Sequence, residues 1–84
     1  MILLMFAVRD SATDSFGNPM FLVSTGQAIR SFRDEVNRKA EDNHLFVHPD
    51  DFEMFELGSF DTSTGRFALL EAPRSVLTAK SCKV

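Results

Sequence analysis

Two histidines, His44 and His48, are followed closely by Asp50 and Asp51, so a metal site is the first chemistry to consider. On a helix, their spacing would place both imidazoles on one face. The intervening Leu45-Phe46-Val47 and the proline after His48 favour an extended chain instead. The imidazoles would then lie ~13 Å apart, although two ligands of one zinc ion each lie only ~2 Å from it. We therefore predict no metal here.

A second candidate chemistry is general acid-base catalysis by the acidic residues Asp50, Asp51, Glu53 and Glu56. Such a pair needs burial or a shared site to separate its two pKa values, and the surrounding residues indicate no pocket. The sequence contains no phosphate-binding loop or dinucleotide fingerprint, and no arrangement of Ser, His and Asp or of Cys and His. We predict that the protein is not an enzyme and uses no cofactor.

Aromatic and cationic residues come together in the C-terminal hairpin. Single-stranded nucleic acid binds where bases stack on rings and phosphates contact Lys or Arg. Phe60 and Phe67, with Arg66 and Arg74 and the nearby Phe55, would provide such a surface; packing of the rings in the core is the alternative. The net charge of −3 and pI of about 5.2 argue against a general nucleic-acid coat.

The size and composition of the chain indicate one small domain. It has 84 residues, of which 44% are hydrophobic, and nine Phe with no Trp or Tyr, so most rings are expected in the core. The single Cys82 excludes an internal disulfide and is typical of a reducing cytoplasm. No segment approaches the ~20 apolar residues of a membrane span, and the apolar N-terminus is too short for a signal peptide.

The N-terminal half predicts two strands and a helix. Residues 2–8 are apolar on both alternations, as in a central strand, and a loop rich in turn formers separates them from a short strand at 20–23. A capping box at 24–27 begins a helix over 26–40 with an apolar stripe. The stripe consists of Ala28, Ile29, Phe32, Val36 and Ala40. Opposite charges four residues apart on this helix are Arg30 and Asp34, Asp34 and Arg38, and Glu35 and Lys39.

The C-terminal half predicts a hairpin. Strands at 53–60 and 66–70 flank a loop in which Gly65 adopts a left-handed conformation. Pro73 ends the second strand, and 74–84 is a polar tail.

The predicted fold is α+β: a four-stranded, mainly antiparallel sheet with one amphipathic helix on one face, in the order β-β-α-β-β. The domain spans residues 1–73 and the C-terminal tail 74–84. One helix covers only one face, so the other apolar face predicts a homodimer, with the chain termini folding over that face as the alternative.

The chain contains a series of short sequence blocks. They are an N-terminal strand ending in Asp10, then Ser24-Thr25-Gly26, Ala28-Ile29-Arg30-Ser31-Phe32, His48-Pro49-Asp50-Asp51-Phe52, Phe55-Glu56-Leu57-Gly58, Phe60-Asp61 and Thr64-Gly65. The order and spacing of these blocks resemble the small non-structural protein of gokushovirus-type microviruses, which are circular single-stranded DNA phages. The resemblance covers roughly residues 1–75.

The resemblance implies a protein of the infected bacterium's cytoplasm that is absent from the virion. It implies a role in single-stranded genome synthesis and its coupling to packaging, with no catalytic residues. The net negative charge favours contacts with phage replication or procapsid proteins over general coating of DNA. The alternatives are a sequence-tolerant single-stranded DNA-binding protein and a small inhibitor or redirector of a host factor.

Overall fold

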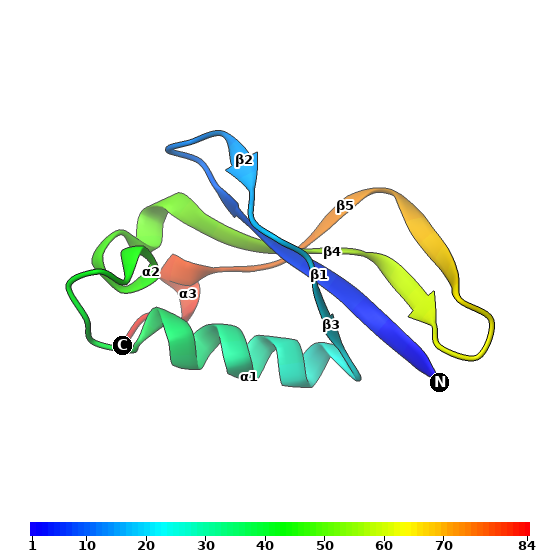
Figure 1. The fold of residues 1–84 in the computed structure, drawn as a ribbon. Coiled ribbons are helices and arrows are strands. Elements are labelled where there is room, and N and C mark those ends of the chain that lie inside the picture. Colours follow the sequence, from blue (N-terminus) through cyan, green and yellow to red (C-terminus); the bar gives the residue numbers. More distant parts are fainter.

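The computed structural model describes all residues from Met1 to Val84 and consists of a twisted antiparallel sheet with helices along one side and at one end (Figure 1). The elements in chain order are β1 (Ile2–Asp10), β2 (Ser15–Phe16), β3 (Met20–Leu22), α1 (Thr25–Val36), α2 (His44–Val47), the 3-10 helix η1 (Pro49–Asp51), β4 (Phe52–Asp61), β5 (Arg66–Thr78) and α3 (Ala79–Cys82).

The sheet is built around β1, which pairs with β4 along its whole length. The short strands β2 and β3 share the other edge of β1, and β5 pairs with the outer side of β4. All pairings are antiparallel. The predicted α+β class, with a mainly antiparallel sheet and a helix packed against it, is therefore confirmed. The predicted loop after β1 contains the additional strand β2.

The main core lies between the sheet and α1. Alternate residues of β1 and β4, among them Phe6 and Met54, point to this side and are fully buried. From α1, Phe32 and Val36 pack against them, as the predicted apolar stripe requires. We call this side of the sheet the covered face. Its partly buried strand residues are Leu4, Val8, Met20, Leu22, Phe52, Val76 and Leu77.

Helix α1 begins where its capping box predicts. The Ser24 hydroxyl accepts a hydrogen bond from the backbone N–H of Gln27 at 3.1 Å, and the Gln27 side chain accepts one from the N–H of Val23 at 3.1 Å. The helix ends at Val36, four residues before the predicted end at Ala40. The predicted ion pairs four residues apart are absent, and Arg38 instead pairs with Glu35.

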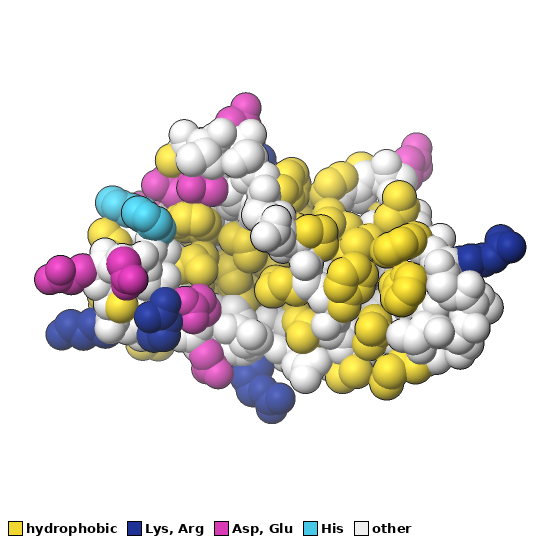
Figure 2. All heavy atoms as spheres, in the orientation of Figure 1, with side chains coloured by type: hydrophobic (Ala, Val, Ile, Leu, Met, Phe, Trp, Pro, Cys, Tyr) yellow, Lys and Arg dark blue, Asp and Glu magenta, His cyan; other side chains and the backbone are white.

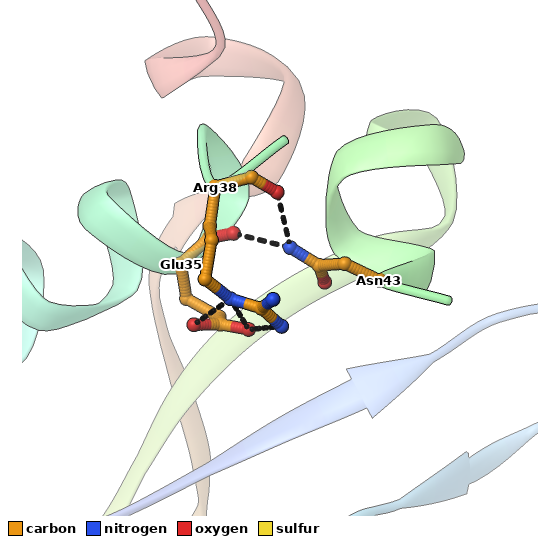
Figure 3. Close-up of polar contacts among 3 residues, drawn as sticks. All are labelled: Glu35, Arg38 and Asn43. Carbon is orange, nitrogen blue, oxygen red and sulfur yellow. Dashed lines mark hydrogen bonds and ion pairs between the residues drawn. The ribbon is translucent and has the colours of Figure 1, made fainter. Parts of the chain in front are cut away.

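Two asparagines explain the early end of α1, because they satisfy the last helical carbonyl groups. The buried side chain of Asn43 donates to the carbonyl oxygens of Glu35 at 2.8 Å and Arg38 at 2.9 Å (Figure 3). Asn37 donates to the carbonyl oxygen of Arg33 and to that of Cys82, both at 2.9 Å. The end of α1 is thus tied both to the following loop and to the C-terminus.

The prediction that residues 74–84 form a polar tail is wrong. Strand β5 continues through Pro73 to Thr78, and α3 follows it. Residues 70–73 of β5 have no partner on β4, so a proline without an N–H costs no ladder hydrogen bond there. Figure 1 shows β5 arching away from β4 over this stretch. Ala79 and Cys82 then enter the main core, so the C-terminal segment is part of the domain.

Candidate functional site

The face of the sheet opposite α1 is also apolar, but no helix covers it. Strand alternation and cross-strand register place nine hydrophobic side chains on it, including five of the nine Phe. We call this surface the open face. Its residues are Leu3, Met5, Ala7, Phe16, Phe21, Phe55, Phe60, Phe67 and Leu69.

The phenylalanines of the open face form two groups. Phe16 and Phe55 meet edge to face, with ring centroids 5.4 Å apart. Phe60 and Phe67 pair across β4 and β5 at 4.8 Å, and Phe21 from β3 joins them at 6.0 and 6.4 Å. These separations lie within the range of favourable ring pairs. The rings therefore stabilise one another although the layer is half open to solvent.

The larger group surrounds a hollow. Leu3, Phe21, Phe60 and Phe67 line a cavity of about 340 Å³ that no polar residue touches. Leu69, two residues beyond Phe67 on the same side of β5, is 70% exposed. The open face thus carries an apolar hollow beside an apolar projection. In Figure 2, hydrophobic side chains gather over the half of the molecule that holds the N-terminus and the β4–β5 hairpin, while charged side chains lie mostly over the helical end.

A bulge in β4 creates this arrangement. Met5 pairs with Gly58 and Phe6 with Glu56, so Leu57 has no partner on β1. The extra residue reverses the alternation of β4 and brings Phe55 and Phe60, five positions apart, to the same face.

Gly58 lies beneath the rings at the centre of the open face, with a φ of +152°. An added Cβ would lie 2.3 Å from the Ala68 carbonyl oxygen and 2.8 Å from the Leu69 Cα. Only glycine therefore allows β5 to approach this closely. The Gly65 φ of +72° confirms the predicted left-handed turn residue of the hairpin.

The predicted nucleic-acid surface is only partly assembled. Phe60 and Phe67 lie together, but Arg66 points to the opposite side of β5, as strand alternation requires. Arg74 lies across from Glu56 and forms an ion pair with it at 2.7 Å, so its charge is already neutralised within the sheet. Arg66 is exposed and forms no ion pair.

The two histidines lie at the helical end and not on the open face. The predicted extended segment between them is the short helix α2, which stacks His44 and His48 with ring centroids 6.2 Å apart. The extended-chain argument for a 13 Å separation is therefore wrong. Both rings border a cavity of about 340 Å³ together with Asp10 and Asp51. The structure holds no group of three or more His, Cys, Asp or Glu side chains that could share a metal ion.

The acids considered for catalysis have structural partners. The Glu53 carboxylate accepts a hydrogen bond from the Ser75 hydroxyl, and Glu56 holds Arg74. Asp50 and Asp51 lie in the first turn of η1, where the partial positive charge at the start of a helix favours acidic side chains.

The groups whose pKa values shift clearly all lie at the helical side. The hydrogen bonds from Arg38 hold the pKa of Glu35 below its usual value, and the same pair raises the pKa of Arg38. Burial raises the pKa of the Cys82 thiol.

Sequence reasoning missed Leu3, Phe21 and Leu69 as parts of the site. The available signal was the alternation of β1, whose residues are apolar on both sides. The partners that complete the hollow come from β3, β4 and β5, and their register is a tertiary property.

The fold and the site define a small α+β protein with one closed core and one open apolar sheet face. None of its helices is long and apolar enough to cross a membrane. A family model described as Phage ORF5 protein matches residues 3–82, nearly the whole chain. The chain therefore belongs to the Phage ORF5 protein family and is a phage protein. No curated protein and no solved structure matches it.

Proposed function

We propose that this protein is a non-structural accessory protein of a gokushovirus-type microvirus, made in the cytoplasm of the infected bacterium and absent from the virion. It acts in the synthesis of the single-stranded DNA genome and in coupling that synthesis to packaging. It works through protein contacts and catalyses no reaction. Two observations support this assignment: the chain belongs to a phage protein family, and the order and spacing of its short sequence blocks resemble those of the gokushovirus protein.

The open face is the observation that carries the protein-contact mechanism. Surfaces that bind nucleic acid hold phosphates with exposed Lys and Arg. The open face instead presents Phe and Leu side chains, and its one cation, Arg9, is paired with Asp14. Contiguous exposed apolar side chains of this kind are typical of protein interaction sites.

A stop codon early in the phage gene tests the biological role, with a synonymous change at the same codon as the control. The proposal expects double-stranded replicative DNA to form normally, whereas single-stranded genomes and DNA-filled particles decrease. Quantification of both DNA forms in infected cells checks this. Normal yields of single-stranded genomes, or the protein's presence in purified virions, would contradict the proposal.

Direct binding of single-stranded DNA is the second candidate, since the exposed rings of Phe21 and Phe67 lie in one group with Phe60 and since Arg66 is free. It expects Arg66→Ala to flatten the dependence of log affinity on log salt by ~0.7, the contribution of one phosphate contact. Arg74→Ala should change the slope less, because Glu56 already neutralises this cation.

Fluorescence anisotropy with a labelled single-stranded oligonucleotide at several salt concentrations separates the two candidates. The protein-contact mechanism expects weak or absent binding that neither variant alters. A steep salt dependence that Arg66→Ala reduces would favour the DNA-binding candidate.

A further inference from the structure

The open face leaves a large apolar area in water. Phe16 and Phe21 are each 43% exposed, Phe67 58% and Leu69 70%. If a large side chain presents 150–250 Å², these four residues alone expose on the order of 400 Å². This is already within the size of the largest apolar patch on most monomers, and it approaches the ~600 Å² that each partner contributes to a small specific interface.

The shape of the open face is self-complementary. A symmetric dimer requires one surface that fits itself, so that residue i contacts residue j and j contacts i. The hollow lined by Leu3, Phe21, Phe60 and Phe67 provides the receiving half of such a contact. Leu69 beside it provides the inserting half, because its side chain is mostly exposed and lies on the same side of the sheet.

The charges also permit two copies to face each other. No charged side chain lines the hollow. Asp61 and Arg66 at the hairpin end point to the other side of the sheet. At the end of the sheet away from the β4–β5 hairpin, Arg9 of β1 lies across from Glu53 of β4, and the two charges are opposite in sign. The hollow and the hairpin end therefore carry no patch of one charge that would repel a second copy.

We propose that a second copy of this chain covers the open face, forming a symmetric dimer in which each copy inserts Leu69 into the hollow of the other. The inference rests on the proposed function in one respect, namely that the open face contacts protein and not nucleic acid. The dimer buries the half-exposed rings and completes the second apolar layer of the sheet. The helical ends remain outside this interface.

Sedimentation velocity over a concentration series up to tens of micromolar tests the dimer. Leu69→Asp should raise the dimer dissociation constant by at least about tenfold, because it places a carboxylate in the apolar hollow. The matched control is Val47→Asp, since Val47 is 45% exposed but lies on α2 at the helical end. This control should dimerise like the wild type. Circular dichroism checks that both variants are folded.

Cross-linking provides a second measurement, which remains informative even if the Leu69→Asp variant does not fold. A mixture of Leu69→Cys and Leu3→Cys chains, one of them isotopically labelled, should form a disulfide between the two kinds of chain under mild oxidation. A mixture of Val47→Cys with Leu3→Cys should not. The native Cys82 is buried and should contribute little.

A wild-type protein that stays monomeric at tens of micromolar would overturn the dimer, and so would a dimer that Leu69→Asp leaves unchanged. A monomer whose open face instead binds a phage replication or procapsid protein also overturns it, while the proposed function stands. Conversely, the dimer could depend on Leu69 while the gene proves dispensable for single-stranded genome synthesis. Those two results together would support this inference and contradict the proposed function.

Discussion

The two faces of the same sheet differ in how completely they are covered. On the covered face, Phe6 and Met54 are fully buried, and Phe32 from α1 is 5% exposed. On the open face, Phe21 and Phe67 are about half exposed although they come from equally apolar segments. The covered face has a helix whose stripe matches it, and the open face has none within the chain. The comparison teaches that rings such as Phe21 and Phe67 stay half exposed where no second element packs on the sheet.

The largest effect should separate the two faces directly. Phe32→Ala should lower the free energy of unfolding by about 3–5 kcal/mol, because it leaves a cavity in the main core. Phe67→Ala, measured at concentrations where the chain is monomeric, should lower it by less than about 1 kcal/mol, since much of the ring is already in water. Urea denaturation of both variants checks this. Similar losses would mean that the two faces are equally closed.

Gly58 tests whether the open face depends on the close approach of β5. Gly58→Ala should destabilise the domain by about 2–4 kcal/mol, because the added methyl group meets backbone atoms that cannot rotate away and the positive φ disfavours a side chain. Gly65→Ala is the matched control. It has nothing within 4 Å of the added Cβ and should lose only about 1 kcal/mol through its left-handed φ. Thermal denaturation distinguishes the two, and equal losses would argue against the close approach.

Asn43 tests how the helix of the covered face is held. Asn43→Ala should cost about 1–3 kcal/mol, since the carbonyl groups of Glu35 and Arg38 lose the partly buried hydrogen bonds that this side chain donates at the end of α1. The exposed Asn18 makes no side-chain hydrogen bond, and Asn18→Ala should change stability by less than about 0.5 kcal/mol. Hydrogen exchange should show faster opening of the last turn of α1 only in Asn43→Ala. Unchanged protection would show that this cap is dispensable.

The smallest effect concerns the Glu35–Arg38 pair, which is largely exposed. The pair lowers the folded-state pKa of Glu35 below the ordinary 4.5. Its contribution to stability is therefore present above that pH and is lost as the pH falls through the folded-state value. Glu35→Gln should reduce stability slightly at pH 7, close to the error of denaturation, and not at all in strong acid. An effect that persists in acid would have another cause.

Local signals predicted much of the covered side. The capping residues Ser24 and Gln27, the stripe containing Phe32 and the left-handed Gly65 all depend on residues within a few positions of one another. Such short-range geometry repeats from protein to protein, which is why these three features followed from the sequence. The strand that continues past Pro73 did not follow, because the unpaired stretch that accommodates the proline exists only beside β4.

What the sequence alone determined is therefore the succession of β1, β3, α1, β4 and β5, the amphipathic face of α1 and the surplus of apolar residues in β1. The tertiary structure alone decided which residues share a face. The bulge at Leu57 brought Phe55 and Phe60 together, and the register of β5 set Arg74 against Glu56 and away from the rings. The physical reason is that strand partners are distant in the chain, and a shift of one residue in their register exchanges every side chain between the two faces.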